Sequence, residues 1–509
     1  MQKATPIGES IPNRYTWAMA TIRFLLFVCI AACGADIGPQ PEGGLPSTQP
    51  DESVEQSRLT ITSPEDGAVY ENWQTIELAT DTVNGATIEW HSSIDGLLGR
   101  GEMQTTRLSV GRHTISVRSD RAESEVDVEI IEEQTIETVV LGTPANDRST
   151  QVAIAPDRSF YIAGDTDGEF QQTRSEGGQD VFVHKLDHNG IRQWTHQFGS
   201  EEHDELNGIA AGHNGVVLVG QVRGDFLDQE HVRGFDAVVL SLNSDGEVVF
   251  TNLIGGPGDE AFSDVVILPD GDIIAVGEAE SPLFTMQFTP PPTPFAVQFS
   301  PTGMIRWATQ LPFNGRFTSI DVGPDGRLGL AGYGFQEDTG LDVFVLEIVD
   351  GIDSPPLFFG TDSQDAFPDI SYSGTDLVIA FQTHGMFAPS DLTIGQSQFA
   401  IIHLDENLRE RGRAQYPDSA GIDVPRLVTT PDTIYVGGAV IPIGSQLFRI
   451  EPDLSLREIE TLSEGRFDGV FGTALFENHL YLSGQVFTEI DGKPTSGFLD
   501  SFLKAVPLR

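Results

Sequence analysis

Short apolar runs separated by polar turns make up most of the chain, and one kind of run returns at a regular interval. Its first example is FYIAGD at 160–165, an apolar strand that ends in glycine and a polar residue. The later examples are VVLVGQ, IIAVGE, LGLAGY, LVIAFQ, TIYVGG and LYLSGQ. The fifth residues of the seven runs are spaced by 56, 57, 55, 49, 56 and 47 residues, at Gly164, Gly220, Gly277, Gly332, Phe381, Gly437 and Gly484. A short strand that recurs at this interval is typical of a repeat architecture and suits a four-stranded propeller blade.

The other parts of each repeat follow the recurring run in a fixed order. A variable loop leads to a second apolar strand, a turn that ends in glycine, and another strand, as in FDAVVLSLN, SDG and EVVFTNLI at 235–254. Glycine supplies the positive φ that tight hairpins need, so these turns join antiparallel strands. Four such strands form one blade, and the recurring run is its second strand.

Two stretches carry a resemblance to a known repeat. Asp180–Gly199 and Asp259–Gly277 follow the pattern DxFVxKLDxxGxxxWxxxFG and GDDxxxxIAxDxxGNxYVxG. This pattern resembles the bacterial β-propeller repeat known as SBBP, and the resemblance implies a β-propeller over residues 134–509. The later repeats depart from it, because Phe381 replaces the glycine and the sixth repeat is weak around Asp423, Val424 and Leu427.

The two ends of this region predict how the propeller closes. The last repeat ends in SGFLDSFLKAVPLR, which matches a third strand and leaves no fourth. ETVVLGT at 137–143 precedes the first full repeat and resembles a fourth strand. The early strand would complete the last blade and remove both open sheet edges. We therefore predict an all-β, seven-bladed propeller, with six or eight blades as alternatives.

Residues 58–132 predict a separate small β-sandwich. Alternating strands at 59–70, 75–81, 86–93, 106–119 and 124–132 are separated by turn residues, with DGLLGRG at 95–101 as a loop. Trp90 is the expected core residue, with Ile88 on the same strand face. SPEDG, IEWHSSIDGLLGRG and GRHTISV resemble bacterial Ig-like and PKD-like modules, which implies a spacer or adhesive unit. His91 and His113 are expected on polar strand faces rather than as metal ligands.

The N-terminus has the features of an export signal. Arg23 is followed by FLLFVCIAA, a run too short to span a bilayer. IAAC at 30–33 resembles the lipobox of bacterial lipoproteins, which implies a signal peptide over 1–33 and a lipid on Cys33; an ordinary secretory signal is the alternative. Residues 34–57 are rich in Pro, Gly, Ser, Gln and acids, which predicts a disordered tether. We expect a lipid-anchored protein of the cell envelope, at the outer membrane or cell surface.

Charge and cysteine content exclude several classes of function. Lys and Arg number 29 against 76 Asp and Glu, a net charge of −47, which argues against a nucleic-acid partner. The acidity predicts a solubilising surface, with a Ca²⁺-loaded surface as the alternative. The two cysteines, Cys29 and Cys33, both lie in the N-terminal segment, so the folded part has neither a disulfide framework nor a cysteine metal site.

Loop lengths predict where a ligand would bind. Strand alternation puts the short first-to-second and third-to-fourth turns on one face and the other loops on the opposite face. That second face carries the long inserts 166–179, 222–234, 279–293, 333–340 and 382–397. Binding residues tend to lie on loops held by a rigid scaffold. The face also has acidic joints, whose candidate ligand-binding residues are Glu201, Glu202, Asp204, Asp259, Glu260 and Asp362.

These carboxylates are also the candidates for Ca²⁺. The nearest approach to a calcium loop, Asp165–Glu169, lacks the required spacing. We therefore predict no metal site and take solvated loops as the default, with Ca²⁺ as a minor alternative.

Catalytic motifs are missing from the sequence. There is no H-E-x-x-H, G-x-S-x-G, Walker loop or G-x-G-x-x-G after a strand. His203 has no nucleophile placed beside it, and Trp194 and Trp307 are expected in packing between blades. The sequence favours a non-catalytic lipoprotein that binds a protein or glycan and needs no cofactor. An exported quinone-dependent dehydrogenase or lyase is the alternative, and a structural spacer is a third.

Overall fold

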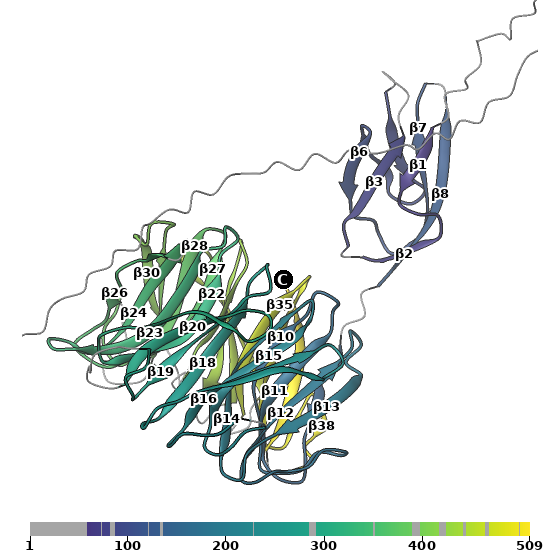
Figure 1. The fold of residues 1–509 in the computed structure, drawn as a ribbon. Helices are drawn as coiled ribbons and strands as arrows, with labels where there is room; N and C mark the ends of the chain where they lie inside the picture. The colour runs from purple at the N-terminus through teal and green to yellow at the C-terminus, as the bar shows by residue number, and fades with distance from the viewer. Residues whose placement is uncertain are drawn as a thin grey trace, which may run out of the picture. The chain divides into compact units, whose positions relative to one another are not determined.

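The structure, a computed structural model, describes most of the chain beyond residue 58. The described ranges are 59–72, 74–81, 87–120, 122–132, 136–227, 229–284, 292–349, 352–388, 398–416, 424–440, 444–463, 468–497 and 499–508. Every regular element in them is a β-strand (Figure 1). They contain no helix that is long and apolar enough to cross a membrane. The predicted signal peptide and tether, with Cys33, lie outside the described residues.

Residues 59–132 form two packed sheets. The first has the order β1 (Thr60–Ser63), β3 (Ile76–Asp81) and β6 (Met103–Thr106). The second has the order β2 (Ala68–Glu71), β8 (Glu123–Ile131), β7 (Gly111–Arg118), β4 (Glu89–Ser92) and β5 (Gly96–Arg100). Their inner faces share one apolar core, in which Trp90 and Ile88 are both buried, as predicted.

Two expectations for this part were wrong. The stretch 95–101, predicted as a loop, contains β5, which pairs with β4. His113 was expected on a polar face, yet it is 1% exposed, because it alternates inward with Ile115 and Val117 along β7. Its Nδ1 lies 2.7 Å from Ser92 Oγ and its Nε2 lies 2.6 Å from the carbonyl oxygen of Ser109, so both ring nitrogens have partners. A buried polar ring is tolerated when it is bonded in this way.

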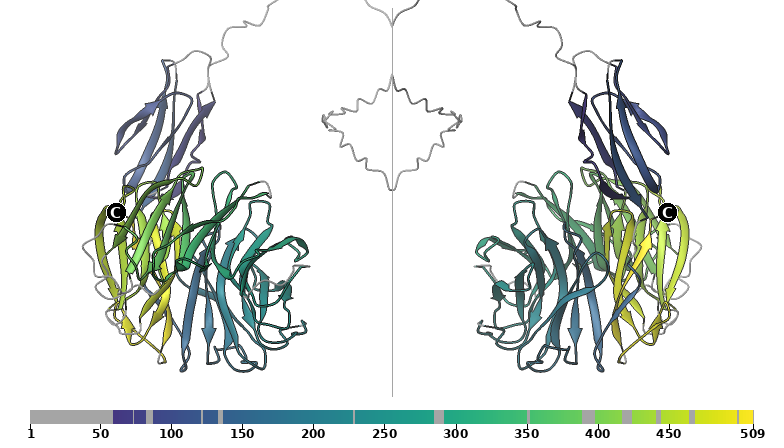
Figure 2. Two further views of the ribbon diagram at one scale, coloured as in Figure 1. Left: turned by 90° about the vertical axis from the view of Figure 1, so that its left-hand side faces the viewer. Right: turned by 90° about the vertical axis from the view of Figure 1, so that its right-hand side faces the viewer.

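The described residues from 136 onward form seven antiparallel sheets of four or five strands of the β-propeller type, each beside the next, and one two-stranded hairpin (Figures 1 and 2). The first sheet has β10 (Asp147–Ile154), β11 (Phe160–Thr166), β12 (Asp180–Leu186) and β13 (Arg192–Phe198). The second has β14 (Asp204–Gly212), β15 (Gly215–Val222), β16 (Asp236–Asn243) and β17 (Val248–Ile254). The third has β18 (Glu260–Ile267), β19 (Ile273–Ala279), β20 (Thr293–Phe299) and β21 (Ile305–Gln310).

The remaining sheets repeat this order with small variations. The fourth has β22 (Gly315–Val322), β23 (Leu328–Gln336) and β24 (Gly340–Val349), with β25 (Ile352–Asp353) and β26 (Leu357–Phe359) both paired to β24. The fifth has β27 (Asp365–Ser373), β28 (Asp376–Thr383), β29 (Gln398–Leu404) and β30 (Glu410–Tyr416). The sixth has β31 (Arg426–Thr429), β32 (Ile434–Val440), β33 (Gly444–Ile450) and β34 (Leu456–Ser463). The seventh has β35 (Gly469–Phe476), β36 (His479–Val486), β39 (Asp500–Pro507) and β9 (Val139–Leu141), with the hairpin β37 (Glu489–Ile490) and β38 (Lys493–Pro494) before β39.

The recurring run is the second strand of each sheet, as predicted. The early strand β9 pairs with β39 in the seventh sheet, with Leu141 opposite Ser501, which confirms the predicted pairing of the two chain regions. The first and seventh sheets also share a hydrophobic cluster in which Phe160 packs on Tyr481, with ring centroids 4.6 Å apart. Apolar burial between neighbouring sheets therefore joins the start of this region to its end.

The recurring glycine has a steric cause that the sequence did not reveal. In five sheets the first strand has a β-bulge directly opposite it, at 149/151, 206/208, 262/264, 317/319 and 470/472. The bulge presses a first-strand carbonyl oxygen onto the second strand. A Cβ at the glycine would lie between 1.8 and 2.0 Å from that oxygen, at Gly164, Gly220, Gly277, Gly332 and Gly484. Because the oxygen belongs to the backbone, no side-chain rotation relieves the clash.

In the two remaining repeats, no carbonyl oxygen of the described first-strand residues presses on the fifth position of the recurring run. In the fifth sheet Phe367 and Pro368 both lie in the bulge, so no residue of β27 pairs with Phe381, which still pairs with Ala400 on β29. The Phe381 ring instead packs on Phe387, with centroids 4.8 Å apart. In the sixth sheet β31 begins opposite Gly437, and the nearest atom to a Cβ there is a side-chain methyl of Val470 at 3.2 Å.

Gly277→Ala should destabilise the protein, because the new Cβ would lie 1.9 Å from the carbonyl oxygen of Ala261 and the strand pair would have to shift. Overpacking of this kind costs about 1–3 kcal/mol. Gly437→Ala is the matched control at the same repeat position and should cost clearly less, because only a side chain must move. Chemical denaturation of both variants checks this. Equal losses of unfolding free energy in the two variants would show that the carbonyl contact is not the reason for glycine at this position.

Candidate functional site

A cavity of about 340 Å³ lies where the first strands of the second to sixth sheets begin and their second strands end. This is the end from which the long loops leave. The bulges of the second to fifth sheets supply much of its wall, since their extra residues line it: Asn207, Ser263, Thr318, and Phe367 with Pro368. The other lining residues are Glu205, Gln221, Ala261, Glu278, Arg316, Tyr333, Val424 and Arg426. A concave site with convergent polar and aromatic groups is the usual form of a ligand pocket.

The bulge residues also hold neighbouring sheets together. Asn207 Nδ2 donates to the carbonyl oxygen of Phe262 at 2.8 Å, and Thr318 Oγ1 donates to the carbonyl oxygen of Pro368 at 2.7 Å. In each case a side chain from one bulge satisfies a backbone acceptor at a bulge of another sheet. The wall of the cavity is therefore bonded across the sheets and pre-formed.

Most charged groups in the cavity have partners. Arg316 Nη1 lies 2.7 Å from Glu278 Oε1, and its guanidinium lies 5.4 Å from the centroid of the Tyr333 ring. Burial raises the pKa of Glu278, and the Arg316 charge opposes that rise. Glu205 Oε2 accepts a hydrogen bond from Gln221 Nε2 at 2.7 Å. Both carboxylates are thus held by neighbouring donors.

Arg426 differs from these groups. Its Nε is buried and has no hydrogen-bond partner among the described residues. Its charge acts on Asp264, whose pKa it lowers against the opposing effect of burial. A buried donor without an acceptor costs about 1–3 kcal/mol, so Arg426 has hydrogen-bonding capacity that the described residues do not use.

Phe367 presents an aromatic ring at the cavity. Phe367 is 39% exposed. Its ring centroid lies 5.3 Å from that of Tyr333, and the two ring planes are inclined by 66°. Its φ is +52°, a conformation that bulky residues rarely adopt. Backbone strain of this kind is concentrated at functional sites.

Behind the cavity, buried aspartates connect one sheet to the next. Asp264 Oδ2 accepts from the Ile320 amide at 2.9 Å, and Asp369 Oδ2 accepts from the Leu427 amide at 2.7 Å. Burial raises the pKa of Asp264 to about 7, and the Asp369 charge adds to the rise. Each of these aspartates directly follows a bulge in the sequence, so the bulge places it against the neighbouring strand.

The six acidic residues predicted for the loop face separate into two groups. Glu201, Glu202, Asp259 and Asp362 are exposed, whereas Asp204 and Glu260 are fully buried. Asp204 Oδ2 accepts from the Ser200 amide at 2.5 Å, and Glu260 Oε2 accepts from the Gly256 amide at 2.6 Å. These two carboxylates fasten the loops between sheets. In the part of the chain that the structure describes, no three Asp, Glu, His or Cys side chains come together in a way that could hold a metal ion.

The prediction of long loops was wrong for one range, and the structure adds detail for the others. The range 333–340 is no loop, because β23 runs to Gln336 and β24 begins at Gly340. The inserts 166–179 and 222–234 each carry a buried aromatic ring, Phe170 and Phe226. The inserts 279–293 and 382–397 lie only partly within the described residues. Parts of the variable loops therefore serve packing.

The predicted packing role of the two tryptophans is confirmed. Trp194 packs on the cluster between the first and second sheets and donates to the Ser244 carbonyl oxygen at 3.2 Å. Trp307 packs on the cluster between the third and fourth sheets. His203 is partly exposed, and its Nε2 lies 3.3 Å from Glu205 Oε1.

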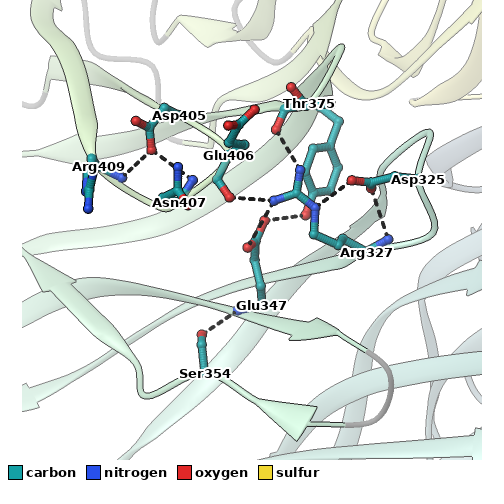
Figure 3. Close-up of polar contacts among 10 residues, drawn as sticks. Asp325, Arg327, Glu347, Ser354, Thr375, Asp405, Glu406, Asn407 and Arg409 are labelled. Atoms are coloured by element: carbon teal, nitrogen blue, oxygen red, sulfur yellow. Dashed lines mark hydrogen bonds and ion pairs between the residues drawn. The ribbon is translucent and has the colours of Figure 1, made fainter.

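The opposite end of the sheets has a polar cluster of a different kind (Figure 3). Arg327, which is 13% exposed, bonds to Asp325 at 2.8 Å and to the carbonyl oxygen of Glu406 at 2.7 Å, and lies 3.5 Å from Glu347. Tyr372 in turn donates to Glu347 at 2.9 Å. These contacts join turns of the fourth and fifth sheets. Because the guanidinium is surrounded by acceptors, this cluster stabilises the fold and offers little to a ligand.

A second cavity, of about 450 Å³, also lies at that opposite end, between the second and third sheets. Its only ionisable lining side chains are His213 and Asp270. The 340 Å³ cavity has the convergent charges and aromatic rings that recognition requires, so it is the better candidate site.

Comparison with known proteins gives distant similarity. No family model matches the chain. A stretch of 157 residues is 28% identical to the regulatory protein FlaEY of Caulobacter vibrioides and covers 28% of this chain and 16% of that protein. The chain therefore matches well under two thirds of the length of that curated relative.

The similar solved structures are β-propeller proteins. The WD40 domain of Neurospora crassa Pan2 has a TM-score of 0.45 at 12% identity, over 74% of this chain and 95% of that one. The periplasmic gluconolactonase PpgL of Pseudomonas aeruginosa has a TM-score of 0.41 at 12% identity, over 75% and 97%. A quinonprotein alcohol dehydrogenase-like protein of Bacteroides thetaiotaomicron has a TM-score of 0.37 at 11% identity, over 81% and 98%. The similarity is one of fold.

Stability should rise as the pH falls from 8 to 5. The folded pKa of Asp264 is about 7, above the unfolded value near 3.8, so the folded state holds a proton that the unfolded state releases in this window. This contribution is complete at low pH and is lost as the pH rises through 7. Asp264→Asn should make the melting temperature less dependent on pH.

Melting curves at constant ionic strength between pH 5 and pH 8 measure this effect. Asp245→Asn is the control for the loss of one negative charge, because Asp245 is exposed on a hairpin turn. A profile for Asp264→Asn that matches the unmodified protein would show that Asp264 does not titrate in this range.

Proposed function

We propose that this protein is a non-catalytic lipoprotein of the cell envelope that binds a protein or glycan ligand in the cavity of its β-propeller. A lipid on Cys33 holds the chain to the outer membrane or the cell surface, and residues 34–57 act as a tether. Residues 58–132 are an Ig-like spacer, and residues 134–509 are a seven-bladed propeller.

The seven-bladed arrangement is supported by how the first and last sheets meet. Strand β9 comes from the start of the region and supplies the outer strand of the seventh sheet. The Ser149 hydroxyl on β10 donates to the carbonyl oxygen of Gly484 on β36 at 2.6 Å. Seven consecutive sheets joined in this way leave only short, protected edges for pairing with another chain.

The observation that carries the binding proposal is the cavity wall built from bulge residues. Four consecutive sheets each contribute bulge residues to one cavity. Arg316 with Glu278, and Gln221 with Glu205, are held there in bonded pairs. Groups held in place before binding lose little freedom when a ligand arrives, which favours affinity. Recognition is therefore the function that this geometry supports best.

Cys33→Ser should release the protein from the membrane, because the lipid attachment would be lost. The expected result is no incorporation of radiolabelled palmitate and a shift of the protein from the membrane to the soluble fraction. Cys29→Ser is the matched control and should keep both the label and the membrane association. Labelling of Cys33→Ser at the level of the unmodified protein would refute the anchor.

Blocking the cavity should prevent ligand capture. In a background with Cys29 and Cys33 replaced by serine, Ser263→Cys places a thiol in the cavity wall, and Ser244→Cys places one on a turn at the opposite end. After alkylation with a bulky maleimide, the Ser263→Cys protein should lose its captured envelope ligands, as measured by affinity capture from an envelope extract. The Ser244→Cys protein should keep them. Unchanged capture by both alkylated proteins would place the ligand elsewhere.

A further inference from the structure

We propose that the cavity binds an acidic saccharide, with Arg426 as the partner of a uronate carboxylate and Phe367 with Tyr333 as the surface for the sugar ring. This inference rests on the proposed binding function and adds the chemical class of the ligand. It follows from the unused donor of Arg426, the exposed Phe367 ring and the hydroxyl-bonding groups beside them.

The unused donor of Arg426 indicates an acceptor on the ligand, and an anionic acceptor is favoured because the donor is cationic. Glu278 is paired with Arg316 at 2.7 Å, and Glu205 is bonded to Gln221 at 2.7 Å, so both cavity carboxylates have a donor. Arg426 lines the same cavity with a buried Nε that has no acceptor among the described residues. In a chain with a net charge of −47, such a cation inside a pocket is a specific feature. The planar guanidinium fork matches the geometry of a carboxylate.

The aromatic pair indicates a ligand with a flat apolar face. Phe367 is 39% exposed at the cavity, and its ring is held by Tyr333 at a centroid distance of 5.3 Å. The positive φ of Phe367 and the following Pro368 fix the backbone that presents this ring. The C–H face of a pyranose is apolar while its edge is polar, so it suits an aromatic surface inside a polar pocket.

The remaining wall residues suit the hydroxyl groups of a sugar. Ser263 lines the cavity, and no hydrogen bond of its hydroxyl is found within the described ranges. Gln221 and Asn207 add amide groups, each with one donor already used and further capacity left. A volume of about 340 Å³ is at the small end of ligand pockets, which favours part of a short saccharide over a folded protein segment.

Titration calorimetry of the full-length protein with galacturonic acid trisaccharide tests this inference. The methyl ester of the same trisaccharide is the matched ligand, because it keeps the sugar rings and removes the charges. We expect the free acid to bind at least tenfold more tightly than the ester. Equal affinity for acid and ester, or no binding of either, would overturn the inference.

Arg426→Gln should weaken binding of the free acid at least tenfold, and Arg457→Gln, which removes the same charge from an exposed position on β34, should leave it unchanged. Phe367→Gly is a second variant that remains informative if Arg426→Gln does not fold. It removes the ring while allowing the positive φ, so its melting temperature should not fall, whereas its binding should be lost. Full affinity in either variant would contradict the assignment.

A peptide with a free α-carboxylate is the alternative ligand, because it also offers a carboxylate to Arg426. Its affinity is compared with that of the same peptide as a C-terminal amide. Binding of the peptide without binding of the trisaccharide would overturn the saccharide class. Envelope capture by the alkylated Ser263→Cys protein distinguishes a failure of the saccharide inference from a failure of the proposed binding function. If alkylation blocks envelope capture while no uronate binds, only the saccharide inference fails.

Discussion

The contact between a first-strand carbonyl oxygen and a second-strand glycine controls the inner wall of this propeller. A backbone oxygen lies where the glycine's Cβ would be, at 1.8–2.0 Å in five of the described sheets. The close approach exists because the first strand is bulged at that point, and a bulge places an extra residue on one strand. In the second, third and fourth sheets the extra residue lines the cavity, as Asn207, Ser263 and Thr318. The same glycine that marks the repeat therefore permits the shape of the candidate site.

Part of the protein's acidity is internal and structural. Asp264 and Asp369 accept backbone amides from the neighbouring sheets, and Asp204 and Glu260 accept amides from the loops between sheets. A buried carboxylate is costly to ionise, and hydrogen bonds from backbone amides offset part of that cost. The acidic residues behind the net charge of −47 are consequently not all on the solvated surface, because several of them hold the sheets and loops in place.

Much of the scaffold could be predicted from the sequence, because its signals are local. The recurring second strand follows from apolar runs and turns that lie within a few residues of each other. The pairing of β9 with β39, which are far apart in the sequence, follows from a last repeat that lacks its fourth strand and an unassigned strand before the first repeat. The burial of His113 was predicted wrongly, because a polar side chain at an inward position looks like an outward one in the hydropathy pattern. Strand β5 was missed, because its glycine-rich sequence lacks the apolar alternation of a strand.

The cavity could not be predicted in the same way. Asn207, Ser263 and Thr318 are small polar residues that read as ordinary outward positions, and a bulge leaves no mark in the hydropathy pattern. Arg426 and Phe367 come from different sheets, so their meeting depends on the tertiary arrangement. The recurring glycine was the one available signal, since it implied a close approach on its facing strand. Its meaning became clear only from the strand register.

Amide hydrogen exchange in Gly277→Ala, compared with the unmodified protein, tests this account most directly. If the glycine supports the bulge at the cavity, exchange should accelerate in residues 261–264 at the cavity end of β18, while the turn at 268–271 at the opposite end stays unchanged. An equal change at both ends of the β18–β19 pair, or none at either, would contradict the claim that this contact shapes the cavity wall.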